Sequence, residues 1–301
     1  MLNPALLGIV SAVAWGGADF TARFTSRAIG HASSLFGMLA VGFVILSVWY
    51  VATDAPLVWD GAQAWLMAAA GLAVMVQTLF LYQALARGPV SVVAPIVGCY
   101  PALVLLFAVA MGARPGALQW AAMAAVMTGV VIVGWMATAQ QGANAAQPGA
   151  KATDPNEAPP PGGLQRTFII AAAAAFFYAL GVIAGQASAS VFGELQTLWA
   201  SRWIGLVALI PLFFLPAFRF QMPIRWVPLI ALQGVLDATG YLAVLAPGRG
   251  EGAEVTAVIG SAFGAVAALL ARVVLKETIS WGQWGGIVLI FGGVAVLSGT
   301  K

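Results

Sequence analysis

The chain has 301 residues, of which 61% are hydrophobic and only 8% are charged, against about 25% charged residues in an ordinary soluble domain. Its formal charge of +3 comes from 13 Lys and Arg against 10 Asp and Glu, without a basic run, which excludes a nucleic-acid-binding surface. The single cysteine, Cys99, and the single histidine, His31, exclude a disulfide framework and a multi-His or multi-Cys metal site, and we expect neither a metal nor a cofactor.

Long apolar blocks follow one another along the chain, and blocks of about 20 apolar residues predict helices that cross a membrane. The first five blocks span residues 2–21, 32–52, 63–86, 90–111 and 117–138. Five more span residues 167–190, 195–215, 226–246, 252–275 and 282–298. The first block has no basic leader before it and no small-residue cleavage site after it, so we interpret it as a retained helix rather than a signal peptide. We therefore predict an all-α integral membrane protein of about ten transmembrane helices.

A stretch rich in Gln, Asn, Ala, Gly and Pro lies between the two sets of five blocks. It has nothing to bury, so we predict a linker at residues 140–166 between a first unit, residues 1–139, and a second unit, residues 167–301.

The last blocks of the two units have similar sequences. Two sets of positions correspond: Gln119-Trp120 with Gln283-Trp284, and Gly129 with Gly293. Because each unit holds an odd number of helices, a duplication would be inverted across the membrane. Inverted repeats are typical of transporters and place the binding site in a central cavity at the repeat interface.

The basic residues of the loops are unevenly divided between the two faces. The loops after odd-numbered blocks hold Arg23, Arg27, Arg87, Lys151, Arg166, Arg219, Arg225, Arg272 and Lys276, whereas the opposite side holds Arg114, Arg249 and Lys301. By the positive-inside rule, this distribution predicts a cytoplasmic linker and termini outside.

The strongest candidate for chemistry is Asp237, near the middle of the eighth block. An ionisable side chain costs about 2.5–3.5 kcal/mol at the centre of a membrane, so it needs an explanation. Gln233, Asp237 and Tyr241 share one helical face, which must line the protein interior or a cavity. Asp237 would bind an amine-bearing solute or carry a proton; the alternative is a structural contact with Arg202.

Two other blocks carry polar stripes. Trp15 and Asp19 share a face of the first block, where the alternative for Asp19 is an interfacial pair with Arg23. Thr78 and Tyr82 share a face of the third block, where hydrogen bonds between helices are the alternative to solute binding.

The fourth block contains Pro95, Gly98 and Pro101, with Tyr100 between the last two. Proline removes a helical hydrogen bond, so we expect a bent or broken helix here. Such a helix would line a cavity or would be a simple kink that its neighbours accommodate.

Several motifs resemble the drug/metabolite transporter superfamily, EamA type. They are Ala14-Trp-Gly-Gly-Ala-Asp-Phe20, Tyr82-Gln-Ala-Leu with the later Pro101, and Leu275-Lys-Glu-Thr-Ile-Ser-Trp before Gly285-Gly-Ile-Val-Leu-Ile-Phe-Gly-Gly293. The resemblance covers nearly the whole chain as two units and implies a ten-helix inverted repeat. It implies that these residues lie on cavity-forming helices: Trp15, Tyr82, Tyr100, Tyr178, Asp237 and Tyr241. The family usually has its termini inside, opposite to the charge bias of this chain.

We therefore expect a secondary transporter that moves an amino acid or related metabolite, by export and alternating access, across the plasma membrane of a bacterium. Its partners would be the solute, the lipid bilayer and protons as a candidate coupling ion, without an obligate protein partner. A membrane-embedded enzyme is the alternative, but the isolated acids and single histidine offer no catalytic cluster, so we assign no catalytic residue. A channel or receptor subunit is the third possibility, but no filter-like segment is present.

Overall fold

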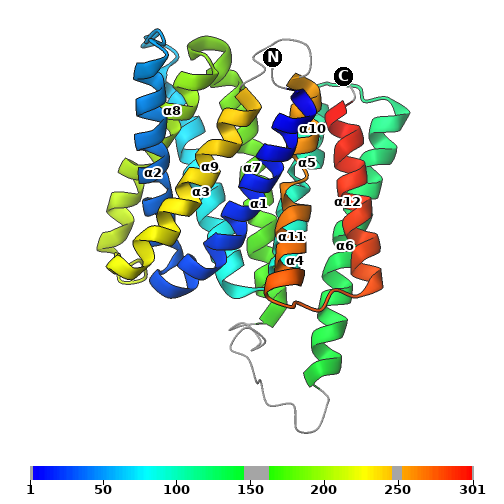
Figure 1. Ribbon diagram of the computed structural model, residues 1–301. Coiled ribbons are helices and arrows are strands. Elements are labelled where there is room, and N and C mark those ends of the chain that lie inside the picture. Colours follow the sequence, from blue (N-terminus) through cyan, green and yellow to red (C-terminus); the bar gives the residue numbers. More distant parts are fainter. Residues whose placement is uncertain (1–2, 146–162, 246–252, 300–301) are drawn as a thin grey trace.

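The computed structural model describes residues 3–145, 163–245 and 253–299, and within these ranges the chain is helical and contains no strand (Figure 1). The first half contains α1 (Pro4–Ile29), α2 (His31–Ala52), α3 (Ala64–Arg87), α4 (Val90–Gly98), α5 (Tyr100–Ala110) and α6 (Ala117–Ala145). The second half contains α7 (Gly163–Phe192), α8 (Glu194–Leu209), η1 (Ile210–Phe214), η2 (Ile224–Trp226), α9 (Val227–Leu245), α10 (Ala253–Gly260), α11 (Phe263–Val274) and α12 (Trp281–Gly299).

The helices stand side by side in one bundle, and their length and composition suit a membrane. Eight helical segments of the described chain are long and apolar enough to span it, and α11 and α12 are shorter apolar helices. Because α10 and α11 follow each other in one line (Figure 1), the prediction of about ten transmembrane helices is confirmed.

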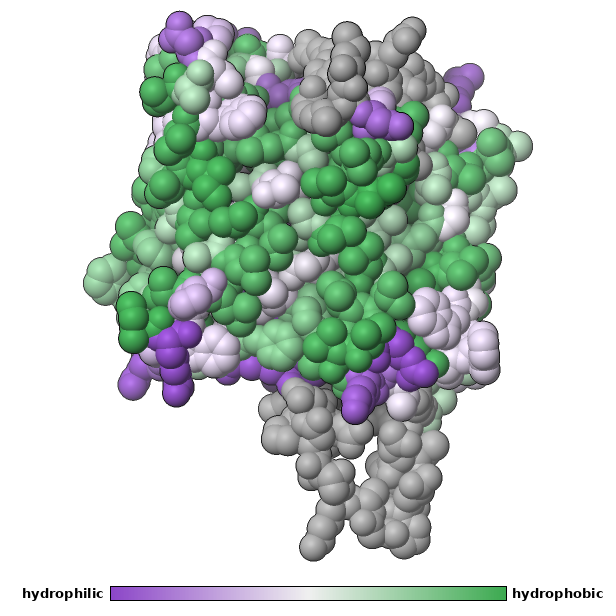
Figure 2. All heavy atoms as spheres, viewed as in Figure 1, coloured by the Kyte–Doolittle hydropathy of each residue, from purple (hydrophilic) through white to green (hydrophobic). Residues whose placement is uncertain are grey.

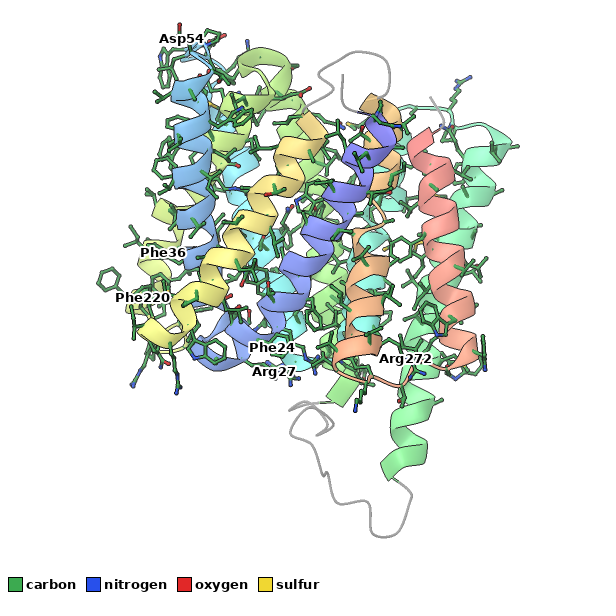
Figure 3. The ribbon with its side chains drawn as sticks, viewed as in Figure 1. Phe24, Arg27, Phe36, Asp54, Phe220 and Arg272 are labelled. Carbon is green, nitrogen blue, oxygen red and sulfur yellow. The ribbon has the colours of Figure 1, made fainter. Side chains whose placement is uncertain are left out.

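The lateral surface of the bundle is apolar. Figure 2 shows a broad band of hydrophobic residues between polar rims at the upper and lower ends. Large apolar side chains such as Val131 and Val288 are 61% and 67% exposed there, which is favourable only against lipid. Arg27 and Arg272 lie at the lower rim and Asp54 at the upper rim (Figure 3).

The observed helices lie close to the expected blocks, with two notable extensions. Helix α1 continues to Ile29, and α6 continues to Ala145 beyond the lower rim (Figure 1). The end of α6 is rich in Ala and Gln, which form helices readily without needing to be apolar. The end of α6 and the start of α7 are therefore helical where the linker at 140–166 was expected to begin and end. Residues 146–162 lie outside the described residues.

Two of the spans are broken near their middle. The break between α4 and α5 falls at Cys99, between Pro95 and Pro101, as the prolines predicted. The break between α10 and α11 has no proline to mark it, and the sequence analysis missed it. At both breaks the backbone tightens into a three-residue turn, in which the Cys99 N–H donates to Ile96 O (3.2 Å) and the Ala262 N–H to Ile259 O (3.1 Å).

The sharp corner between the first two helices of each half has the same construction. Gly30 (φ 86°) joins α1 to α2 and Gly193 (φ 83°) joins α7 to α8, both in a conformation that favours glycine. A pair of buried hydroxyls bridges each corner: Thr25 Oγ1 with Ser34 Oγ (2.7 Å), and Ser188 Oγ with Thr197 Oγ1 (2.9 Å).

The turn before the last helix of each half also recurs. Gly112 (φ 100°) precedes α6, and Lys276 (φ 54°) precedes α12. Both helices begin with a glutamine side chain that accepts a backbone N–H: Gly116 N–H to Gln119 (2.9 Å) and Ser280 N–H to Gln283 (2.8 Å). Since α1 begins at the upper end of Figure 1 and α7 at the lower end, the matching helices run in opposite directions.

Helices α6 and α12 pack against each other through glycines. An ideal Cβ on Gly286 would lie 2.9 Å from Gly129 O, and one on Gly129 would lie 2.6 Å from Gly286 O. An ideal Cβ on Gly293 of α12 would likewise lie too close to Ala122 O of α6. Small residues therefore allow the two backbones to approach closely, as helices in lipid commonly do.

We predict that Gly286→Ala destabilises the protein by about 1–3 kcal/mol, because the methyl group would force α6 away. Gly285→Ala is the matched control: its Cβ meets no atom within 4 Å, so the better helix propensity of alanine should make it neutral or slightly stabilising. Unfolding by SDS in mixed micelles, followed by circular dichroism, measures both. Equal effects of the two substitutions would contradict the glycine contact.

Candidate functional site

A buried ion pair lies at the centre of the bundle, between α8 and α9. Arg202 Nη2 donates to Asp237 Oδ2 at 2.7 Å, and their side chains are 1% and 14% exposed. Gly42 of α2 leaves room for the guanidinium, since an ideal Cβ there would lie 3.3 Å from Arg202 Nε. That Nε is itself buried and has no hydrogen-bond partner among the described residues. The contact between Asp237 and Arg202, which was the structural alternative in the sequence analysis, is therefore present.

Aromatic rings surround this ion pair. The Arg202 guanidinium lies 4.7 Å from the ring centre of Tyr241, a cation–π contact. Trp15 of α1 meets Tyr241 edge to face, with centres 4.9 Å apart, and Gly240 leaves the space that the indole occupies. Two predicted site residues on different helices, Trp15 and Tyr241, are thus brought together.

The aromatic cluster continues across the two helix breaks. Phe263, the first residue of α11, lies 6.1 Å from Trp15 and 6.5 Å from Tyr178, measured between ring centres. Tyr178 of α7 stacks on Tyr100, the first residue of α5, with centres 4.4 Å apart. Each broken span therefore places one ring beside the central helix α1 or α7. Phe263 was missed by the sequence analysis because an apolar ring in an apolar block carries no distinguishing signal.

A second polar group lies on the same face of α9, toward the lower end. Gln233 Nε2 donates to Tyr82 Oη at 2.5 Å, and Gln233 Oε1 accepts from Thr25 Oγ1 at 2.8 Å. Thr25 also meets Ser34, so this chain of hydrogen bonds joins α1, α2, α3 and α9. The α9 stripe therefore faces the interior, as predicted. Thr25 and Ser34 were missed, although their recurrence as Ser188 and Thr197 was a signal in the sequence.

The structure does not bring every predicted residue into this cluster. Thr78 is buried on α3, but it makes no hydrogen bond within the described part of the chain. Its neighbour Gln77 is also buried, with Oε1 close to where a Cβ on Gly181 of α7 would lie. Thr78 is therefore close in sequence to Tyr82 but separate from the hydrogen-bonded chain.

The expected pair between Asp19 and Arg23 does not form. Asp19 is 9% exposed within α1, rather than interfacial, and the charged group that acts on it is Asp237. Arg23 instead lies 3.4 Å from Glu277 in the turn before α12 and donates to Gly88 O. The reason is that α4 begins beside α1, where Glu277 offers a more favourable acidic partner.

Glu277 also caps α4. Its carboxylate accepts the backbone N–H groups of Val90 and Ser91, both at 3.1 Å, and the Ser91 hydroxyl at 2.6 Å. A carboxylate at a helix N-terminus satisfies otherwise unpaired donors and complements the helix dipole. The turn before α12 therefore also caps the start of α4.

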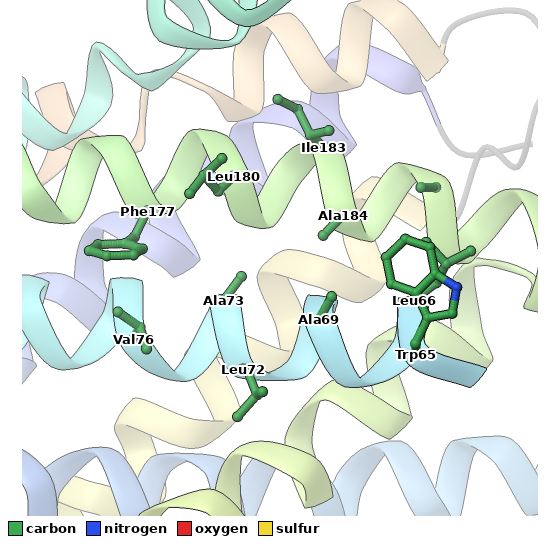
Figure 4. Close-up of a pocket in the computed structure, with 11 residues that line it drawn as sticks. Trp65, Leu66, Ala69, Leu72, Ala73, Val76, Phe177, Leu180, Ile183 and Ala184 are labelled. Carbon is green, nitrogen blue, oxygen red and sulfur yellow. The ribbon is translucent and has the colours of Figure 1, made fainter. Parts of the chain in front are cut away.

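A pocket lies away from the charged centre, in the groove between α3 and α7 (Figure 4). It has a volume of about 470 Å³ and is lined almost entirely by apolar side chains, including Leu66, Val76, Phe177 and Leu180. Such a lining suits a hydrocarbon chain and offers nothing to hold a charge. The polar centre, in contrast, is closely packed, with Arg202, Gln233 and Tyr82 nearly inaccessible to solvent.

We predict that Asp237→Ala destabilises the protein by about 3–5 kcal/mol, because it leaves the Arg202 charge buried without its acid. The double substitution Arg202→Met with Asp237→Leu removes both charges and should recover most of this loss. Unfolding by SDS in mixed micelles measures all the variants. If the loss in the double variant equals the sum of the losses in the single variants Asp237→Leu and Arg202→Met, the two side chains do not act as a pair.

The comparisons with known proteins agree with this architecture. The model of the EamA-like transporter family matches residues 2–135 and 165–299. A solved structure titled "Crystal structure of protein" aligns with 97% of this chain and 94% of its own, with a TM-score of 0.59 and 18% sequence identity, a likeness of fold alone. No curated protein sequence matches the chain. Because the two family matches together span most of its length, this multi-pass membrane protein belongs to the EamA-like transporter family.

Proposed function

We propose that the chain is a secondary transporter for a small zwitterionic solute, an amino acid or a related metabolite, with Arg202 and Asp237 as its charged contacts. The observation that carries this proposal is the buried ion pair at the centre of the bundle, enclosed by aromatic rings. Membership of a transporter family makes transport, rather than catalysis, the function that this site would serve.

The ion pair matches the charges of a zwitterion. A buried ion pair is a poor source of stability, since desolvation offsets most of the attraction between its charges. An amino acid could insert its carboxylate against Arg202 and its ammonium against Asp237, so that neither protein charge would be left alone. Arg202 also keeps a spare donor for this purpose, because its buried Nε has no partner among the described residues. A site left with an unpaired polar group rejects a solute that cannot satisfy it.

The rings beside the ion pair suit the rest of such a solute. Trp15 and Tyr241 pack next to Arg202, and Tyr100 and Tyr178 form a stacked pair across the same centre. Aromatic faces bind apolar and aromatic groups with a favourable stacking energy of about 0.5–1.5 kcal/mol beyond burial. We therefore expect large apolar or aromatic amino acids to be better substrates than small or charged ones.

Alternating access is the mechanism that the halves support. We propose two inverted units, residues 1–139 and 167–301, joined through the linker at 140–166. The two broken spans both meet the aromatic cluster at their breaks, where a rocking movement could open the centre to one face and then the other. Export across the plasma membrane is the expected direction. The basic residues at the lower rim, such as Arg27 and Arg272, support a cytoplasmic lower face.

The proposal can be tested with three probes of matched shape in liposomes that contain the purified full chain. L-Phenylalanine carries both charges, 2-phenylethylamine carries only the ammonium, and 3-phenylpropionate carries only the carboxylate. We expect counterflow of L-phenylalanine and at least about tenfold weaker transport of the other two, since a factor of ten corresponds to about 1.4 kcal/mol.

Substitutions of the ion pair should change this selectivity in opposite directions. Asp237→Asn should weaken L-phenylalanine transport by about tenfold or more and shift the preference toward 3-phenylpropionate, while Arg202→Gln should shift it toward 2-phenylethylamine. Asp60→Asn, in the exposed loop between α2 and α3, is the matched control and should transport like the wild type. Equal movement of all three probes, or unchanged selectivity in both variants, would refute the assignment of the ion pair.

A further inference from the structure

Asp19 differs from the other acids in the interior in having no basic partner. It is buried within α1, and it makes no hydrogen bond or ion pair with any described residue. Each interior acid or base around it is already engaged: Arg202 pairs with Asp237 at 2.7 Å, and Arg23 with Glu277 at 3.4 Å. A carboxylate in this position would be an uncompensated negative charge.

The charged group that acts on Asp19 is a second acid, Asp237 on α9, which makes a negative charge on Asp19 less favourable still. The other titratable groups around it are the hydroxyls of Tyr82 on α3 and Tyr178 on α7, which bring no positive charge. Helices α2 and α11, which also pack against α1, carry their titratable groups near their ends. Arg272 of α11 donates to the backbone of the turn before α12, and His31 of α2 lies at the lower corner. No cation on these elements therefore approaches Asp19 in the described structure.

We propose that Asp19 carries the coupling proton of the transport cycle, while Asp237 stays ionised against Arg202; this rests on the transport function proposed above. A buried carboxylate without a cation takes up a proton rather than remain charged in a medium of low dielectric constant. The conformation described here, with its centre closely packed, is thus the one that binds the proton. Two acids on neighbouring helices then have different tasks because only one of them has an arginine.

This arrangement predicts exchange of one proton for one solute molecule. The ammonium of a bound amino acid would lie against Asp237, where its positive charge would favour the ionised form of Asp19 on the neighbouring helix without binding to it. The proton on the Asp19 carboxyl oxygen would leave to water on the side to which the centre is open. When the solute departs on the other side, Asp19 must bind a proton from that side before the centre closes. Solute and proton therefore move in opposite directions, which suits export driven by a proton gradient.

The first test needs no solute. Infrared difference spectroscopy on the full chain in lipid nanodiscs detects the carbonyl band of a protonated carboxylic acid, identified by its shift in D₂O. At neutral pH we expect this band in the wild type and in Asp54→Asn, an exposed control whose left-handed conformation asparagine tolerates. The band should be lost in Asp19→Asn, which keeps the shape of the protonated acid. A band that persists in Asp19→Asn, or is missing from the wild type, overturns the proposal.

The second test measures coupling in liposomes with L-phenylalanine as the probe. An imposed pH gradient should drive its accumulation by the wild type, by Asp54→Asn and by Asp19→Glu, which keeps a titratable group. Asp19→Asn should keep solute counterflow but lose gradient-driven accumulation at least about tenfold. Gradient-driven accumulation by Asp19→Asn, or counterflow without any response to the gradient in the wild type, overturns the role of Asp19 and leaves the transport function standing. If the wild type moves no probe, the transport function fails and the infrared result alone decides the protonation of Asp19.

Discussion

The pairing of Arg202 with Asp237 is the interaction on which the centre of the molecule depends. The packed helices keep water away from both charges, so each charge needs the other in order to remain in the interior. Three helices build this ion pair. Helices α8 and α9 each contribute one charge, and α2 contributes the space at Gly42. The ring of Tyr241 then lies against the guanidinium, and Trp15 lies against that ring, so the pair also positions α1.

Much of this architecture was predictable because a bilayer imposes a strong rule on sequence. Apolar blocks must be about as long as the membrane is thick, so the number and approximate positions of the spans followed from composition alone. The interior face of α9 followed from the spacing of Gln233, Asp237 and Tyr241, since residues four apart share a side of a helix. Arg202 could be suggested as a partner because it is the one charged residue of its block.

The remaining features depend on which helices become neighbours. The spacing of residues along one helix does not contain that information. Asp19 and Arg23 are one turn apart and looked like a pair, but α4 and the turn at Glu277 lie closer to the arginine in space. The break before Phe263 has no proline, so no residue in its block marked it. The stacking of Tyr100 on Tyr178 likewise joins two halves whose contact could not be read from either block alone.

The glycine-lined contact of α6 with α12 has a consequence for how the protein is made. The two helices are the last of their halves, so α6 enters the membrane long before its partner has been synthesised. Its small-residue face must therefore remain exposed to lipid, without the close backbone contact at Gly129, until α12 has been synthesised and inserted. Biogenesis of the bundle is consequently complete only once α12 is in place, and a chain truncated before α12 would expose that face to quality control.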